Sequence, residues 1–139
     1  MKITSGIKHT VAMLDENSST LDAARLMTEK FIGSVVVTSH GQVAGILTER
    51  ELMVQVVGKD RDPAKVKVGE VMHTDHLRIH PDANCEEALR HMQEHGRRHL
   101  LVFDDDRFVG LVSLRDIVVL TLKEKDDLIA QLQHYIVEP

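Results

Sequence analysis

Two short motifs combine a hydroxyl, an arginine and a carboxylate at a spacing that suits ligand chemistry. Thr48–Glu51 reads Thr-Glu-Arg-Glu, and Ser113–Asp116 reads Ser-Leu-Arg-Asp. A hydroxyl residue followed three positions later by an acid is typical of a helix start, where the acid reaches back to the cap. Such a start also presents free N–H groups and a positive dipole end, which suit a phosphate or a ribose. Each motif is therefore either a simple capping box or part of a binding site.

The two motifs belong to an internal repeat with an offset of 65 residues. Residues 9–57 align with residues 74–122 without a gap, and the apolar pattern is kept where identity is lost. Identical pairs inside the helices include Ala23/Ala88, Arg25/Arg90, Met27/Met92 and Glu29/Glu94. Units of this size are too small to be very stable alone, so we expect them to bury their sheets against each other.

The composition is that of an ordinary globular protein. The chain has 139 residues, of which 42% are hydrophobic and 28% charged. A formal charge of −5 weighs against a nucleic-acid or membrane partner, and 3% aromatic residues weigh against base stacking. No apolar run reaches the length of a membrane span, and no signal peptide is visible. A single cysteine favours a reducing compartment, so we expect a cytoplasmic protein.

The elements that must position the motifs form the same series twice. In the first copy we expect strands at 11–14, 33–38 and 42–47, a helix ending near Phe31, and a helix over 48–57. The second copy repeats them with strands at 77–80, 99–103 and 108–112, and an extra helix at 126–136 follows. The fold class is therefore α+β, with two tandem β-α-β-β-α repeats packed through their sheets about a pseudo-two-fold axis, plus a C-terminal helix. The expected divisions are 1–57 (first repeat with an N-terminal arm), 58–70 (linker), 71–122 (second repeat) and 123–139 (C-terminal helix).

The doubled motifs resemble the CBS-domain pair, a regulatory module of two such repeats. The resemblance covers residues 7–122 and rests on the stretches 45–51, 71–72, 87–100 and 110–116. The last helix is also similar to that of small stand-alone bacterial CBS-pair proteins. Members of the family commonly bind adenosine-containing ligands such as AMP, ATP, NAD or S-adenosylmethionine, and commonly dimerise.

The resemblance implies two composite adenosine sites, each with residues from both repeats. The hydroxyl and acid of one repeat would face phosphate and ribose, and strands of the other would hold the base. The first site would comprise Leu111, Ser113 and Asp116 with Thr10, Ala12, Ile32 and Gly33. The second would comprise Ile46, Thr48 and Glu51 with Leu77, Arg97 and Arg98. There a glutamate replaces the usual aspartate, and arginines align with Ile32 and Gly33, which weighs against ordinary adenosine binding.

The main cationic feature is the run Arg97-Arg98-His99, accompanied by Arg50 and Arg115. Arginine forks bind phosphate oxygens through two parallel bonds, so these residues are candidate phosphate ligands. The alternative for Arg50 and Arg115 is pairing with local acids on exposed helix turns.

Other reactive residue types form no persuasive site. His91 and His95 have a zinc-compatible spacing but lack the acid order and the third ligand of zinc-protease motifs, so we expect no metal. Cys85 is expected to be a buried small residue rather than a nucleophile. We therefore expect no catalysis, no cofactor in a catalytic role, and an adenine nucleotide, AMP or NAD in preference, as a regulatory ligand. The expected partners are a second copy in a homodimer and an effector protein; the alternative is a ligand-free oligomerisation or protein-interaction module.

Overall fold

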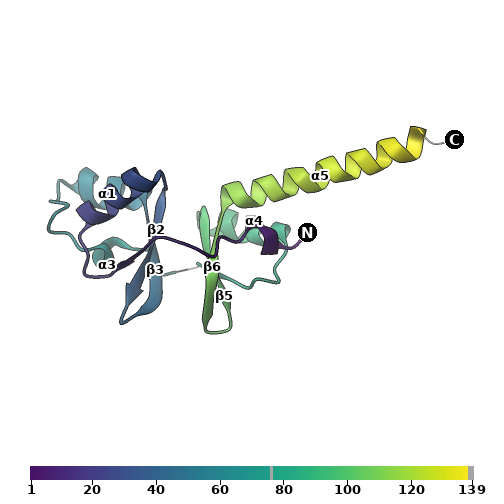
Figure 1. Cartoon of the computed structure of the whole chain (residues 1–139). Helices are drawn as coiled ribbons and strands as arrows, with labels where there is room; N and C mark the ends of the chain where they lie inside the picture. The colour runs from purple at the N-terminus through teal and green to yellow at the C-terminus, as the bar shows by residue number, and fades with distance from the viewer. Residues whose placement is uncertain (76, 138–139) are drawn as a thin grey trace. The chain divides into compact units, whose positions relative to one another are not determined.

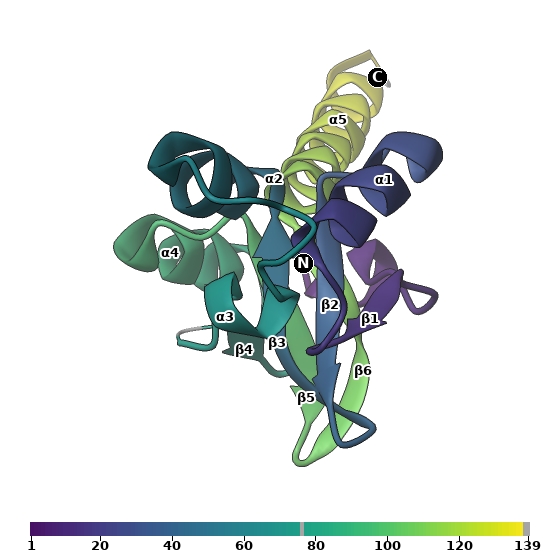
Figure 2. The ribbon, with the colours of Figure 1, turned by 90° about the vertical axis from the view of Figure 1, so that its left-hand side faces the viewer.

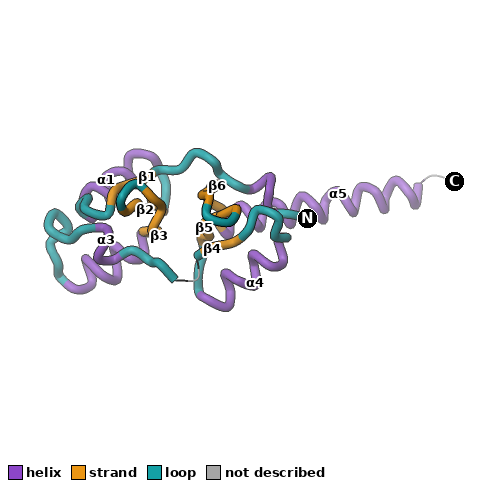
Figure 3. The backbone as a smooth tube through the Cα atoms, turned by 90° about the horizontal axis from the view of Figure 1, so that it is seen from below, coloured by secondary structure: helices purple, strands orange, loops and turns teal. Residues whose placement is uncertain are grey.

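The computed structural model describes residues 1–75 and 77–137 (Figure 1). The chain divides into two compact units. The N-terminal unit is Thr10–Asp75, and the C-terminal unit joins Met1–His9 to the chain from residue 76 onward. In each unit the helices lie on one side of that unit's sheet (Figure 3).

The N-terminal unit contains a three-stranded sheet in the order β1-β2-β3, with β1 (Met13–Asp15), β2 (Ser34–Ser39) and β3 (Gln42–Thr48) (Figure 2). β1 is parallel to β2, and β2 is antiparallel to β3. Helix α1 (Thr20–Lys30) begins at Ser19, whose hydroxyl accepts the N–H of Asp22 at 3.0 Å. The β-branched run at 35–37 suits a buried strand. Val35 and Val37 pack in the same core cluster as Ala23 and Met27 of α1.

The C-terminal unit repeats this series with a shorter first strand. Its elements are β4 (Arg78–Ile79), α4 (Cys85–His95), β5 (His99–Asp104) and β6 (Arg107–Ser113). Adding 65 to the bounds of α1, β2 and β3 gives the bounds of α4, β5 and β6, and the bulge after Val37 recurs after Val102. The predicted α+β class with two β-α-β-β-α repeats is confirmed.

The N-terminal arm, residues 1–9, packs on the C-terminal unit, whereas the sequence placed it with the first repeat. Its 3-10 turn η1 (Ile3–Gly6) buries Ile3 in the core formed by α4, β5, β6 and α5. The Ile3 N–H donates to the Ala83 carbonyl at 3.0 Å, and the Cys85 N–H donates to the Met1 carbonyl at 2.9 Å. The arm thereby caps the start of α4.

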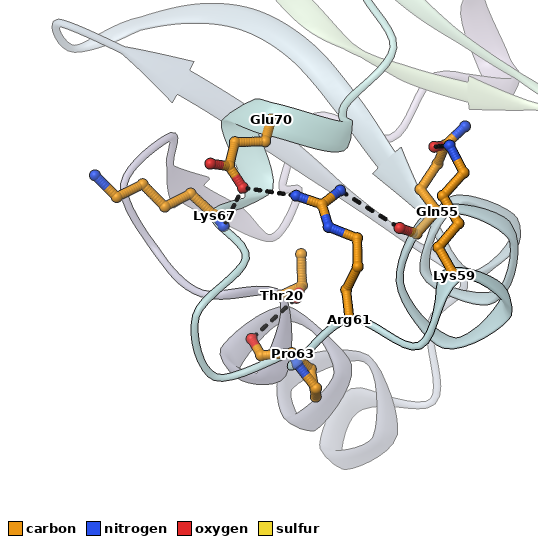
Figure 4. Close-up of polar contacts among 7 residues, drawn as sticks. All are labelled: Thr20, Gln55, Lys59, Arg61, Pro63, Lys67 and Glu70. Atoms are coloured by element: carbon orange, nitrogen blue, oxygen red, sulfur yellow. Dashed lines mark hydrogen bonds and ion pairs between the residues drawn. The ribbon is translucent and has the colours of Figure 1, made fainter.

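The expected linker at 58–70 is an integral part of the N-terminal unit (Figure 4). The Thr20 hydroxyl donates to the Pro63 carbonyl at 3.0 Å, and Arg61 reaches the Glu70 carboxylate at 3.4 Å. The following helix α3 (Val68–Val71) buries both of its end residues in the core under α1. Residues 66–74 therefore pack on the core of the N-terminal unit, as the N-terminal arm packs on the core of the C-terminal unit.

The helices that close the two units differ from the sequence expectation. After the motif at 48–51, α2 (Glu49–Glu51) passes into a π-helical turn η2 (Leu52–Val56) and a 3-10 turn η3 (Val57–Lys59), where one regular helix was expected. In the second unit, the last repeat helix and the extra helix are one continuous helix, α5 (Leu114–Val137), of 24 residues. α5 runs well past α4 and the arm (Figure 1).

Candidate functional site

The motif Ser113–Asp116 forms a complete capping box at the start of α5. Asp116 Oδ2 accepts the Ser113 N–H at 2.9 Å and the Ser113 hydroxyl at 2.7 Å, and the Asp116 N–H lies 3.1 Å from Ser113 Oγ. The other carboxylate oxygen, Oδ1, faces the Lys8 ammonium at 3.7 Å, which is beyond hydrogen-bond distance. The Lys8 side chain is largely exposed, so this cation lies beside Asp116 Oδ1 without a direct hydrogen bond to it.

The equivalent motif Thr48–Glu51 has a fully engaged carboxylate. Glu51 Oε2 accepts the Thr48 N–H at 2.9 Å and also the Thr48 hydroxyl. Glu51 Oε1 is contacted by Nε2 of His73, and the Glu51 side chain is only 6% exposed. Both oxygens of this acid are therefore occupied by groups of its own unit.

Two backbone bridges place Lys8 and His73 beside the acids. The N–H and carbonyl of Lys8 pair with Leu111 at 2.8 and 2.9 Å, and those of His73 pair with Ile46 at 2.8 and 3.0 Å. Position 73 is position 8 plus 65, so the basic residues are related by the same repeat as the motifs. The sequence reasoning missed both because it began the repeat at residue 9; extending the register by one residue would have paired them.

The predicted cationic residues lie at the start of β5 and at the helix starts. The Arg98 carbonyl accepts the Leu114 N–H at 2.7 Å, and His99 is opposite Ser113 in the β5–β6 ladder, so this run adjoins the Ser113–Asp116 motif. The Arg97 Nε is buried, with no hydrogen-bond partner among the described residues. Arg50 and Arg115 are exposed, and within the described chain neither forms an ion pair with a local acid.

The remaining predicted site residues are divided between the units. Thr10, Ala12, Ile32 and Gly33 lie around the ends of β1 and β2 in the N-terminal unit. There the Ala12 carbonyl accepts the Val36 N–H at 2.9 Å, and the Gly33 carbonyl accepts the Glu49 N–H at 3.1 Å. Leu77 precedes β4 in the C-terminal unit, where its carbonyl accepts the Leu101 N–H at 2.6 Å. The structure thus brings together the polar half of each predicted site, and the composite sites stay predictions.

No group of three metal-binding side chains occurs among the described residues, and no helix of that part of the chain is long and apolar enough to cross a membrane. His91 and His95 lie with ring centroids 4.8 Å apart on α4. Burial raises the pKa of the Cys85 thiol, which is the opposite of what a nucleophilic cysteine needs.

Comparison with known proteins decides the family. The profile of the CBS domain matches residues 6–58 and again residues 68–123. The chain belongs to the CBS-domain family. The resemblance drawn from the doubled motifs is confirmed, and proteins with such CBS pairs are regulatory or sensor modules.

Individual CBS proteins are similar over most of this chain. The CBS domain-containing protein YhcV of Bacillus subtilis is 32% identical over 109 residues, which cover 78% of this chain and 77% of YhcV. The solved structure of a signal-transduction protein with CBS domains from Burkholderia ambifaria is also similar. It is 34% identical to this chain, has a TM-score of 0.79, and matches over 86% of each chain. Hypoxic Response Protein I, solved with two coordinated zinc ions, is 25% identical with a TM-score of 0.73, covering 85% of this chain and 97% of its own. The chain spans 77%, 58% and 51% of the length of three curated relatives.

Proposed function

We propose that this CBS-domain protein is a regulatory module that binds an adenosine-containing nucleotide, with AMP or NAD favoured. The observation that carries the proposal is the state of Asp116. One of its oxygens holds the capping box, and the other lies 3.7 Å from the Lys8 ammonium. A ribose hydroxyl is a donor that this second oxygen can accept, at a strength typical of bonds to charged groups.

Positive charge around the same motif supports a phosphate-bearing ligand. Lys8, Arg98 and Arg115 all belong to the C-terminal unit, and the N-terminus of the long helix α5 adds its positive dipole end. The family resemblance assigned Arg98 to the second site, but its carbonyl accepts the Leu114 N–H, so we count its charge at the Asp116 motif. The apolar slot for adenine rests on the family resemblance, which implies that Thr10, Ala12, Ile32 and Gly33 hold the base. His99, opposite Ser113, is the further candidate for phosphate contact. We assign no reaction to the site.

The test is calorimetric titration with AMP, ATP, NAD, S-adenosylmethionine and adenosine. Asp116→Ala should weaken binding by about 1.5–3 kcal/mol, the range for a hydrogen bond to a charged group. The matched control is Asp126→Ala, which removes an exposed acid further along the same helix. Because Asp116 also caps α5, the stability of each variant is measured alongside its affinity. A wild-type chain that binds none of these ligands, or an Asp116→Ala variant that binds as tightly as wild type, refutes the proposal.

Arg98→Ala tests the phosphate contact separately. The loss of an arginine–phosphate bond should reduce affinity for AMP more than affinity for adenosine. Equal losses for both ligands would assign Arg98 to packing instead.

A homodimer is the assembly that we propose for this module. Exposed apolar residues occur at repeat-equivalent positions of the two closing helices, as the pairs Met53/Val118, Val54/Val119 and Val57/Leu122. α5 adds Leu128, Ile129, Leu132, Tyr135 and Ile136, each more than half exposed. Apolar surface of this extent is typical of an interface, and closed two-fold pairs are the commonest soluble assembly. The same surface favours the alternative function of a ligand-free oligomerisation or interaction module, and it is where an effector protein would dock.

Light scattering distinguishes the possible interfaces. We expect twice the 15.7 kDa chain mass at micromolar concentration. Val54→Asp with Val119→Asp should give a folded monomer if the repeat helices form the contact, and truncation after Lys125 should do so if the distal part of α5 forms it. A wild-type monomer refutes the dimer. We place the protein in the cytoplasm, since its single cysteine is free and buried, as suits a reducing compartment.

A further inference from the structure

The two acids of the repeated motif differ in the basic residue that faces them. His73 contacts Glu51 directly, whereas Lys8, at the equivalent position, stays 3.7 Å from Asp116. The backbone bridge beside each pair is equivalent, because Lys8 with Leu111 and His73 with Ile46 form the same two hydrogen bonds. At the bridges themselves, the two half-sites therefore differ in their side chains, with histidine and glutamate in one and lysine and aspartate in the other.

Ribose recognition needs an acid oxygen that is not already used. At Glu51, Thr48 takes one oxygen and His73 takes the other, so a ribose hydroxyl would have to displace one of them from a side chain that is 6% exposed. At Asp116, Ser113 takes one oxygen, and a lysine that is 64% exposed lies near the other without a hydrogen bond. An exposed pair of this kind costs little to rearrange, while a buried hydrogen-bonded acid is costly to uncover.

We propose that His73 closes the Thr48–Glu51 half-site, so that the chain has one working adenosine site, at Asp116, and a second one held shut by a side chain of its own. This inference rests on the proposed function, and it makes His73 a residue that determines how many ligands bind. In this role His73 acts through Glu51, as a positioning residue. Lys8 does the opposite at the working site, where its largely exposed ammonium leaves the acid without a hydrogen bond from it and adds charge suited to a phosphate.

The decisive measurement is ligand stoichiometry by calorimetry with AMP as the probe. Wild type should bind one AMP per chain, and Asp116→Ala should weaken that binding about tenfold or more. His73→Ala should bind two, because Glu51 Oε1 is released while the backbone bridge to Ile46 needs no side chain. His73→Gln keeps an N–H donor for Glu51 and should return to one. Two ligands on wild type, or one on a folded His73→Ala, overturns the inference.

A second variant guards against misfolding of His73→Ala. The double change Lys8→His with Asp116→Glu builds the Glu51–His73 pair into the C-terminal unit, and it should weaken AMP binding about tenfold or more, the equivalent of one charged hydrogen bond. Asp116→Glu alone, which leaves Lys8 in place, is the reference against which this tenfold loss is measured. A double variant that binds as well as this reference overturns the inference.

A ligand-free measurement separates this inference from the proposed function. If wild type binds no adenosine ligand, the proposed function fails, and a double-mutant cycle of denaturation midpoints still tests the closure. The effects of His73→Ala and Glu51→Gln should be strongly non-additive, whereas those of Lys8→Ala and Asp116→Asn should depart little from additivity, because an ion pair with an exposed lysine couples weakly. Additive midpoint shifts for His73 and Glu51 would show that His73 does not hold the acid, and would overturn the inference.

Discussion

Gly110→Ala should detach the N-terminal arm from β6. A Cβ at this position would overlap the Lys8 carbonyl oxygen and lie 2.8 Å from Cγ2 of Ile7, so the arm has to move. The two Lys8–Leu111 backbone bonds contribute about 1 kcal/mol each. Partial exposure of the buried Ile7 costs about 1–2 kcal/mol more. Freed backbone returns about 1–2 kcal/mol of conformational entropy, which leaves a net loss of about 2 kcal/mol.

Urea denaturation followed by circular dichroism measures that loss, and limited proteolysis reports whether the arm has become cleavable. The matched control is Gly33→Ala, whose added Cβ meets nothing closer than 3.5 Å and needs no unusual backbone conformation. The control should stay within about 0.5 kcal/mol of wild type, as surface changes usually do. The reasoning fails if Gly110→Ala is as stable as the control and its arm remains protected. Because the arm carries Lys8, Gly110→Ala should also change nucleotide affinity.

Two further predictions concern the pseudo-equivalent helix ends and the buried thiol. Phe31 is 96% exposed and has a left-handed backbone conformation (φ 53°), and the equivalent position in the second repeat is Gly96 (φ 64°). Because glycine adopts this conformation without strain, Phe31→Gly should stabilise the fold by about 0.5 kcal/mol. Gly96→Ala should destabilise it by about 1 kcal/mol in the same urea assay. Gly96→Ala is a clean comparison because no atom lies within 4 Å of the added Cβ; equal stabilities would contradict the argument. Burial raises the pKa of Cys85, so the native thiol should react with iodoacetamide at neutral pH far more slowly than the urea-unfolded chain, and similar rates would show that it is accessible.

The local pattern predicted the helices and hairpins well because each carries its own signal. Helix α4 lies between the cap at Asn84 and the left-handed Gly96, and strand β2 is a β-branched run. α5 was divided wrongly at 123–125, where a charged stretch was taken for a break. Lysine and glutamate are good helix formers, and no glycine or proline interrupts them, so the helix continues.

Longer-range features were not predictable from local pattern. The π-helical turn at 52–56 has no recognisable signal in the sequence. The motifs Thr48–Glu51 and Ser113–Asp116 were found as capping boxes and candidate ligand residues, but their basic partners depend on bridges between distant segments. Those bridges follow from the repeat only when its register is carried to the first residues of the chain.

The exchange of leading segments means that the duplicated sequence and the folding unit are different objects. Residues 1–9 complete the sheet and core of the second repeat, and residues 66–74 complete those of the first. In a chain with only one repeat, the leading segment would have no second sheet on which to pack. Two such chains could each complete their sheets by exchanging leading segments. Gene fusion of a swapped pair would make that trade intramolecular, and it would free positions 8 and 73 to diverge into a lysine and a histidine. A split of this protein for complementation should accordingly fall at residues 9–10 or 75–76, and not between the repeats as the sequence draws them.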